Sequence, residues 1–385
     1  MRYRKFKADQ LFNGFELLTN EHVLITTEYG KIENLVHHSE AGDDIENLEG
    51  ILSPGFINCH CHLELSHMKN AIPEKTGLVD FVYKVVTERN RSEEEIQNAI
   101  ETAEAEMVKN GVVAVGDICN NSSTLTQKQK QNLQYYNFIE ASGWLPGVAA
   151  TRFDRAKKLF DEFAVTNPKS SVVPHAPYSV SEPLWKNIRP YFENKTVSIH
   201  NQETVFEDEF FLEGTGDLKR MYEMMNIDNT HHQPTKRSSL QSYFGKLINA
   251  KNILLVHNTF IRQEDIEYVK SEMSNVKTAV FFCLCINANL FIENCLPPVE
   301  LLLKNNCNIV LGTDSLASNW SLSILDEIKT ISKNFPSVQF VEILKWATIN
   351  GAKALEMDDK LGSFEKGKLP GIVLIKKDLS ALRVL

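Results

Sequence analysis

Residues 53–62 read Ser53-Pro54-Gly55-Phe56-Ile57-Asn58-Cys59-His60-Cys61-His62. The apolar run 54–59 predicts a β-strand, in which side chains alternate between two faces. His60 and His62 then project from one face a few ångströms apart, while Cys59 and Cys61 point to the other face and are expected to be packing residues. Two imidazoles on one face can supply the first two ligands of a divalent transition metal. Alone the pair is a weak indication, because such histidines also occur without a metal.

From residue 54 onward, strand-like runs alternate with helical patterns. Eight candidate strands lie at 54–59, 112–118, 135–141, 171–174, 196–200, 252–257, 277–283 and 308–312. Amphipathic helices are predicted between several of them, for example at 92–109 and 262–271. This alternation predicts parallel βαβ units, and eight units indicate an α/β fold of the (β/α)₈ TIM-like barrel type over residues 54–360.

The two ends of the chain have a different pattern. Residues 1–53 predict short strands and turns, including a β-branched run at 22–27. A turn-rich bridge at 361–368 leads to a strand at 371–376. We therefore expect residues 1–53 and 361–385 to form one small β domain beside the barrel. Residues 204–250 contain no predicted strand and are candidates to cover the barrel mouth.

Composition limits the possible functions. The net charge of −9 and the absence of a basic stripe argue against a nucleic-acid partner. No run of about 18 apolar residues indicates a membrane span, and the basic N-terminus lacks the apolar core of a signal peptide. Seven scattered cysteines favour free thiols in a reducing cytoplasm over a disulfide framework. A soluble cytoplasmic enzyme that acts on a small molecule is therefore expected.

Polar residues that can carry chemistry recur where the predicted strands end. After the His60 and His62 pair come His175, His200 with Glu203 three residues later, His257 and Asp314. A single histidine after a strand is more often structural, and an aspartate there often caps the next helix. Five such coincidences at strand ends, where barrel enzymes build their active sites, favour one joint site.

These motifs resemble the amidohydrolase superfamily, in its branch of deaminases and chlorohydrolases acting on purine, pyrimidine and triazine rings. The likeness is strongest to deaminases of adenosine-type nucleosides, such as the aminodeoxyfutalosine and S-adenosylhomocysteine deaminases. The matching segments are Pro54–Glu64, Pro174–Ser179, His200 with Glu203, Val256–His257 and Gly312–Asn319. The resemblance implies a barrel with a flanking β-sandwich, made here by residues 1–53 and 361–385. It also implies a homodimer.

The family pattern implies one divalent metal ion held by His60, His62, His200 and Asp314. Zn²⁺ suits three neutral imidazoles and a carboxylate, and Fe²⁺ tolerates the same ligands. Binuclear relatives add a carboxylated lysine at the end of the fourth strand. Here that strand ends in Pro174-His175, and Lys169 lies at its start. A single metal is therefore expected.

The resemblance also assigns the chemistry. A metal-activated hydroxide attacks the ring carbon that bears the amino group, and Asp314 takes the proton of the water. Glu203 protonates the adjacent ring nitrogen and later helps ammonia to leave. His257, as a hydrogen-bond donor, holds the attacking oxygen or stabilises developing charge. The alternative interpretation of Glu203 is a solvated carboxylate without a catalytic role in an acidic segment.

Substrate contacts are expected from His175, Glu64 and Ser315. Glu64 could bind a sugar hydroxyl or form a structural ion pair, and Ser315 could line the pocket or cap a helix. His231 and His232 are expected to be exposed, and Cys283 and Cys285 to be core residues. The run 285–289 lacks an arginine, which argues against a substrate that carries a carboxylate.

The sequence predicts a metal-dependent hydrolytic deaminase of an adenine-type nucleoside or related nitrogen heterocycle. One alternative is hydrolysis of a ring amide or halide at the same site. Another, less favoured, is a catalytically silent binding protein that keeps the scaffold.

Overall fold

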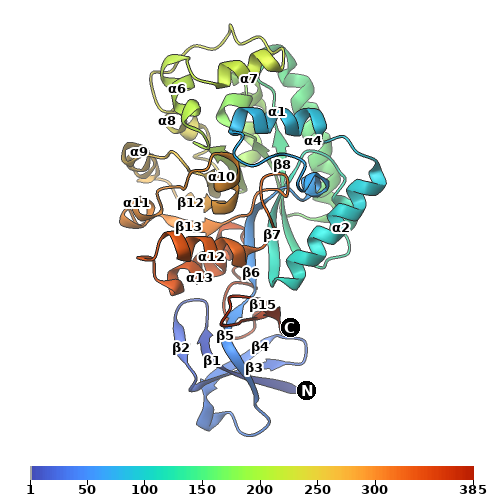
Figure 1. The fold of residues 1–385 in the computed structure, drawn as a ribbon, viewed down its shortest axis with the longest axis vertical. Coiled ribbons are helices and arrows are strands. Elements are labelled where there is room, and N and C mark those ends of the chain that lie inside the picture. The colour runs from blue at the N-terminus through green and yellow to red at the C-terminus, as the bar shows by residue number, and fades with distance from the viewer. Residues whose placement is uncertain (1) are drawn as a thin grey trace.

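The computed structural model describes residues 2–385 and combines a mixed α/β body with a seven-stranded sheet. Figure 1 shows the sheet at one end of the molecule, next to the N and C labels, with the strands and helices of the larger part above it. The prediction of an α/β fold with parallel strands is confirmed.

Eight parallel strands form two four-stranded sheets, ordered β6-β7-β8-β9 and β10-β11-β12-β13. Their bounds are β6 Phe56–Cys61, β7 Val112–Cys119, β8 Gln134–Ala141, β9 Ser170–Pro174, β10 Thr196–Asn201, β11 Asn252–His257, β12 Ala279–Leu284 and β13 Asn308–Leu311. The predicted strands agree within two residues. The first is the most displaced, because residues 46–54 belong to the preceding strand and Gly55 separates the two.

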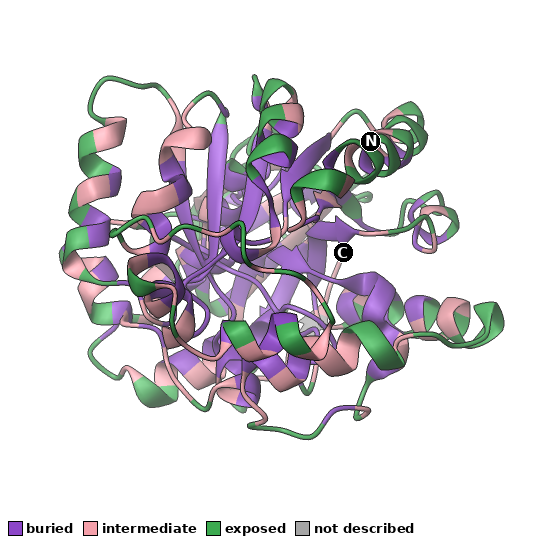
Figure 2. Ribbon diagram, turned by 90° about the horizontal axis from the view of Figure 1, so that it is seen from above, coloured by how far each residue is buried: buried purple, intermediate pink, exposed green. Residues whose placement is uncertain are grey.

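The two sheets contact each other at both edges. The backbone N–H of His200 donates to the carbonyl oxygen of His175 at 3.0 Å. At the other edge, Cys61 and Asp314 form a parallel bridge. This is the arrangement expected of a TIM-like barrel. Figure 2 shows the strands as the buried centre, while the surrounding helices turn exposed residues outward.

Helices connect the strands and pack around them. Their bounds are α1 Leu78–Glu88, α2 Glu93–Lys109, α3 Leu125–Lys128, α4 Ala149–Thr166, α5 Glu182–Ile188, α6 Val205–Glu213, α7 Leu218–Met224, α8 Ser239–Tyr243, α9 Gln263–Met273, α10 Ile286–Ile292, α11 Val299–Lys304, α12 Ile324–Asn334, α13 Phe340–Ala347 and α14 Ile349–Ala354. The predicted helix at 92–109 corresponds to α2, with Ser92 as its N-cap in a capping box with Glu95. The one predicted at 262–271 corresponds to α9.

The seven-stranded sheet draws its strands from both ends of the chain. Its strands are β1 Tyr3–Phe12, β2 Leu17–Thr19, β3 His22–Thr27, β4 Ile32–His37, β5 Glu46–Pro54, β14 Ile372–Ile375 and β15 Ala381–Arg383. The order is β15-β14-β5-β1-β3-β4, with β2 paired to β1. β1 and β5 are longer than the short strands expected there. The assignment of residues 1–53 and 361–385 to a domain separate from 54–360 stays a prediction.

Among residues 2–385 we find no helix that combines the length and apolar character needed to cross a lipid bilayer. Within the same residues the seven cysteines are free, and five of them are buried.

Candidate active site

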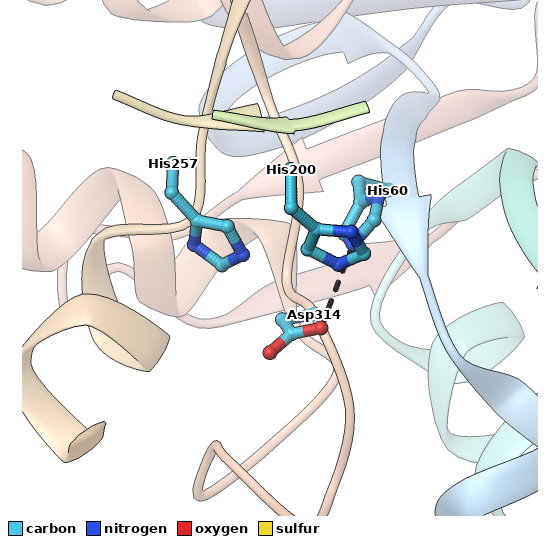
Figure 3. Close-up of side chains that lie close together, drawn as sticks. All are labelled: His60, His200, His257 and Asp314. Atoms are coloured by element: carbon cyan, nitrogen blue, oxygen red, sulfur yellow. Dashed lines mark ion pairs between the residues drawn. The ribbon is translucent and has the colours of Figure 1, made fainter. Parts of the chain in front are cut away.

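Side chains from four strand ends converge at one end of the parallel sheets. The Nε2 atoms of His60 and His62 lie 3.2 Å apart, and the Nε2 atoms of His62 and His200 lie 3.4 Å apart. The Oδ1 atom of Asp314 lies 3.5 Å from Nε2 of His60 and 3.2 Å from Nε2 of His62. Figure 3 shows His60, His200 and His257 pointing toward Asp314, with the ion pair between His60 and Asp314 dashed.

The donor set fits a divalent metal ion. Ligands about 2.1 Å from a tetrahedral zinc ion lie about 3.4 Å from one another, and the four separations here are 3.2–3.5 Å. Nδ1 of His200 lies 2.8 Å from the carbonyl oxygen of His175, so it carries the proton and leaves the Nε2 lone pair free. His60, His62, His200 and Asp314 are therefore the residues that would hold the ion.

The charges of the cluster agree with this use. Burial lowers the pKa of His62 to about 3, with a further contribution from neighbouring histidines, and lowers the pKa of His200 as well. Both rings are therefore neutral at pH 7, as metal ligands must be. Burial alone would raise the pKa of Asp314, but the histidines around it hold that pKa well below its usual range. Asp314 is therefore a carboxylate.

His257 belongs to the same cluster. One ligand atom from each of His60, His200, His257 and Asp314 lies within 4.8 Å of the others. Nδ1 of His257 lies 2.8 Å from Oδ1 of Asn289, whereas its buried Nε2 has no hydrogen-bond partner within the described residues. Burial lowers the pKa of His257, so the ring is neutral with the proton on Nδ1. Its Nε2 therefore presents a lone pair, in contrast to the donor that the sequence analysis expected.

Strained backbone turns two of these residues into the site. His257 has φ of 74° and Asp314 has φ of 59°, in the left-handed region that costs a residue with a side chain about 1–3 kcal/mol. The turn at Asp314 is held because its backbone N–H and that of Thr313 both donate to the carbonyl oxygen of His60. Asn58 completes the clamp by bonding the side chain and backbone of Thr313 at 2.7 and 3.1 Å.

Glu203 lies beside the cluster as a buried carboxylic acid. Its Oε1 is 3.6 Å from Nε2 of His257. Burial raises the pKa of Glu203 well above its usual value, and the Asp314 charge adds to this, so the carboxyl is protonated near neutral pH. Glu207 holds the loop in place, accepting hydrogen bonds from the backbone N–H of Gln202 at 3.0 Å and of Glu203 at 3.4 Å. The solvated alternative for Glu203 is wrong, because its side chain is only 6% exposed.

A cavity of about 360 Å³ opens directly onto this cluster. Its lining includes His62, His200, Glu203 and Asp314, together with all three expected substrate contacts, Glu64, His175 and Ser315. Nδ1 of His175 is 2.8 Å from the Ser179 hydroxyl, and the Ser315 hydroxyl is 2.8 Å from that of Ser318. The volume is in the range of pockets that bury a small organic ligand.

Two helices far apart in the sequence cover the cavity. Leu78, Phe81, Val82 and Val85 of α1 line it, as do Met221 and Tyr222 of α7. Arg220 of α7 forms a bidentate ion pair with Asp80 of α1 at 2.9 and 3.0 Å. Part of the segment 204–250 therefore covers the cavity, as expected.

Trp144, which the sequence analysis did not single out, anchors this cover. Its ring stacks on Tyr222 at 5.4 Å, and its indole N–H donates to Asn229 at 2.7 Å. His231 is exposed as expected, but His232 is half-buried and stacks on Phe210 at 4.0 Å. The expectation of exposure is therefore wrong for His232. The prediction fails for His232 because Phe210, the ring on which it stacks, lies in α6, 22 residues earlier in the chain, and the sequence does not reveal this contact.

A buried ion pair supports the chain directly after His62. Asp117 accepts from the backbone N–H of Leu63 at 2.9 Å, and its other oxygen lies 2.5 Å from Nζ of Lys128. The lysine also donates to Asn137 at 2.9 Å. Its Nζ lies 5.0 Å from the ring centroids of both Tyr135 and Phe163. Breaking this network would release the segment that carries His62.

The cysteines and Lys169 take no part in the cluster. Cys59, Cys61, Cys283 and Cys285 are fully buried and pack in the core, as expected. Gly312 lies against them, because a Cβ there would meet Cβ of His60 at 2.8 Å and Sγ of Cys283 at 2.9 Å. Nζ of Lys169 donates to the carbonyl oxygen of Glu356. This lysine is therefore not available as a bridging ligand.

Several polar residues of the cavity wall have no recognisable signal in the sequence. Glu140, at the end of β8, lines the cavity, and burial raises its pKa to about 7. Arg89, Arg152 and Arg155 line the cavity as well. The missing arginine in the run 285–289 is therefore no argument against an anionic substrate, because guanidinium groups come from other elements. No sequence motif marks these four residues. Glu140 lies in β8, Arg89 follows α1, and Arg152 and Arg155 lie in α4, so only the folded chain shows that they line the same cavity.

The parallel sheets and the histidine–aspartate cluster describe an α/β protein with a candidate metal site, and comparison with known proteins gives its family. The chain belongs to the amidohydrolase family, whose model matches residues 51–384. Proteins of this family bind a divalent metal ion. Family membership and the deaminase relatives identify the chain as a hydrolase that acts on carbon–nitrogen bonds.

Its relatives include several deaminases. The chain is 26% identical over 324 residues to an adenosine deaminase of Helicobacter pylori, covering 83% of this chain and 77% of the relative. It is 27% identical over 354 residues to a 5-methylthioadenosine/S-adenosylhomocysteine deaminase of Thermoanaerobacter pseudethanolicus, covering 87% and 75%.

Solved structures show the same fold. The aminofutalosine deaminase of Helicobacter pylori in complex with methylthio-coformycin superposes with a TM-score of 0.80 at 22% identity, over 97% of this chain and 92% of that one. An adenosine deaminase from Xanthomonas campestris with bound zinc gives a TM-score of 0.72 at 20% identity, over 97% and 84%.

Proposed function

We propose that this protein is a hydrolytic deaminase of an adenine-type nucleoside, with one divalent ion, Zn²⁺, held by His60, His62, His200 and Asp314. The observation that carries the proposal is the buried carboxyl of Glu203, which faces the same cavity as this ligand set and whose pKa burial raises well above its usual value. A ring amine leaves only if the ring nitrogen beside it is protonated, and Glu203 is a proton donor of suitable pKa and position.

The ion would supply a strongly activated water at neutral pH. The side chains around it divide the proton transfers. Asp314, already a carboxylate, accepts the proton of the attacking water. The neutral His257 accepts a hydrogen bond at Nε2 and so orients that water. Glu203 donates to the ring nitrogen, and the proton that Asp314 collected leaves with the amine. The second proton of the attacking water returns to Glu203 as the ring carbonyl forms. The sum is nucleoside plus water giving the ring carbonyl and ammonia.

Relatives support the nucleoside class of substrate. Proteins similar to this chain are named as deaminases of adenosine, 5-methylthioadenosine, S-adenosylhomocysteine and 5'-deoxyadenosine. The apolar wall from α1 and α7 suits a purine ring, and Glu64, His175 and Ser315 are proposed to contact the rest of the substrate. The free cysteines support a cytoplasmic location. The homodimer stays a prediction.

The test is ammonia release from a panel of heterocycles by zinc-loaded protein, followed by the ultraviolet change of the ring. We expect turnover of at least one adenine nucleoside. Release of halide from triazines, or opening of cyclic amides without ammonia, would establish the alternative hydrolytic activity instead. Binding of the panel without turnover would indicate a silent binding protein.

The variant Glu203→Gln tests whether Glu203 is a proton donor or a metal ligand. Glu203→Gln should lose activity by at least about 100-fold, the usual worth of a general acid, while retaining about one metal ion per chain. Glu213→Gln, at an exposed position where the following helix α6 ends, is the matched control and should keep full activity. Loss of the metal in Glu203→Gln would show that Glu203 is a ligand and that the assignment of roles is wrong.

A further inference from the structure

One buried carboxyl that the reaction does not use lies behind the active site, on helix α12. The buried face of this helix consists of Ile324, Leu325, Ile328 and Ile331, with Glu327 among them. Glu327 is fully buried and does not belong to the cavity lining. A carboxyl is costly to bury unless hydrogen-bond donors surround it. The donors around Glu327 therefore indicate its role.

One oxygen of Glu327 holds the start of α10. Its Oε2 accepts from the backbone N–H of Asn287 at 3.1 Å. N–H groups in the first turn of a helix have no carbonyl partner within the helix, and the N-cap residue Cys285 makes no side-chain hydrogen bond to them. Two residues further along, Asn289 bonds Nδ1 of His257 at 2.8 Å. The helix that orients His257 is therefore fixed at its start by Glu327.

The other oxygen of Glu327 supports the turn that carries Asp314. Its Oε1 accepts from the side-chain amide of Asn319 at 3.0 Å. The same amide donates to the carbonyl oxygen of Thr313 at 2.8 Å. Asp314 follows directly, and its left-handed backbone persists only because surrounding bonds hold it. One carboxyl thus links the two segments that present His257 and Asp314.

We infer that Glu327 is a positioning residue, whose carboxyl joins α10 to the turn at Asp314 and so keeps His257 and Asp314 aimed at the same water. This inference rests on the roles proposed for those two residues in deamination. Misplacing a catalytic group by about 1 Å can cost about 100-fold in rate, even when the change lies far from the chemistry. Support of metal-site residues from behind is typically worth about 10- to 100-fold in activity or metal affinity.

Two substitutions remove the link to different degrees. Glu327→Gln keeps the size of the side chain but offers one acceptor and one donor group, so it can hold only one of the two segments. Glu327→Met removes both hydrogen bonds, and the milder glutamine variant remains informative if the methionine variant does not fold.

Glu104, a buried glutamate of α2, supplies the matched control. Its carboxyl accepts from the side-chain amide of Asn132 at 2.8 Å and from the hydroxyl of Tyr135 at 2.7 Å. Both partners lie beside the start of β8, at the end of that strand away from the active site. Substitutions at Glu104 therefore disturb a buried carboxyl of the same kind without reaching the histidine–aspartate cluster.

The experiment measures ammonia release, zinc affinity and urea unfolding in the zinc-loaded wild type and in Glu327→Gln, Glu327→Met, Glu104→Gln and Glu104→Met. Each variant should unfold at lower urea, because each leaves a buried donor without an acceptor. On the nucleoside that the wild type turns over best, kcat should fall about 10- to 100-fold only in the Glu327 variants. KM should stay within about threefold, because Glu327 does not contact the substrate. Zinc affinity, measured by competition with a chelator, should fall about tenfold in Glu327→Met and stay unchanged in both Glu104 variants.

Three results would overturn the inference. The first is a kcat in the Glu327 variants no lower than in the Glu104 variants, which would leave Glu327 with a structural role alone. The second is a rise in KM at constant kcat in the Glu327 variants, which would make Glu327 a determinant of substrate binding. The third is unchanged zinc affinity in Glu327→Met, which would show that the turn at Asp314 does not depend on this carboxyl.

Zinc affinity keeps this inference separate from the proposed function, because its measurement needs no turnover. If the wild type releases no ammonia but Glu327→Met binds zinc about tenfold more weakly than Glu104→Met, the proposed reaction fails and the support of Asp314 by Glu327 stands. If the wild type is a deaminase and these two variants bind zinc equally, the inference fails and the proposed function stands.

Discussion

Replacing Lys128 by Met should destabilise the protein strongly, because it leaves Asp117 charged and buried without its cation. The two side chains are 6% and 0% exposed, and the ion pair spans 2.5 Å. Removing one partner of a buried pair typically costs about 3–5 kcal/mol. Met fills a similar volume, so the substitution removes the charge without leaving a large cavity. Asp117 then keeps the hydrogen bond from the backbone N–H of Leu63 but has lost the ion pair with the lysine. The free energy of unfolding should therefore fall by about that amount.

The double variant Lys128→Met/Asp117→Asn supplies the test of cause. The amide oxygen that Asp117→Asn introduces would still accept from the backbone N–H of Leu63, and no unpaired charge would remain. The stability of the double variant should return to within about 1–2 kcal/mol of the wild type, since neutral replacements of buried pairs are often nearly neutral. The assay is urea unfolding of the zinc-loaded protein, with the midpoint read at constant slope. A cost below about 1 kcal/mol for Lys128→Met, or a double variant no more stable than the single one, would refute the reasoning.

Two further predictions concern pH and packing. Burial raises the pKa of Glu207 to about 8 from a usual 4.5, so between these values the folded state holds a proton that the unfolded state has lost. Stability should fall as pH rises through that window, and thermal unfolding of Glu207→Gln from about pH 5 to 9 should show a shallower fall than Glu213→Gln. Gly312→Ala would place a methyl group 2.8 Å from Cβ of His60, so the bound-metal content measured after dialysis should drop. Gly147→Ala, at an exposed position where an added Cβ meets nothing within 4 Å, should retain it. Full metal content in Gly312→Ala would show that His60 tolerates the displacement.

Parallel buried strands were the most predictable part of the fold. Residues such as 252–257 are apolar in their centre because both faces of the strand are covered, and their limits stand out against polar turns. β1 was harder to recognise, because the partly exposed Arg4, Lys5 and Lys7 interrupt its apolar pattern. Its length reflects pairing with β5, which begins about 40 residues later.

The candidate ligands were predictable for a similar reason. Histidines and an aspartate at the ends of apolar strands mark a barrel mouth without knowledge of tertiary contacts. Glu140 has the same position on its strand but lacks a motif, so its unpartnered oxygen is visible only in the folded chain. Trp144 depends on Tyr222, 78 residues later by their numbering, and such a contact has no local signal.

The sheet at the end of the molecule has a consequence for biosynthesis. β5 lies between β1 and β14 in that sheet, and it leads through Gly55 directly into β6. During translation, β5 leaves the ribosome more than 300 residues before β14, so one of its edges stays unpaired while the barrel is being made. An open strand edge is a template for wrong pairing with another chain. Nascent chains of this protein should therefore depend on chaperones until residues 372–375 emerge and close that edge.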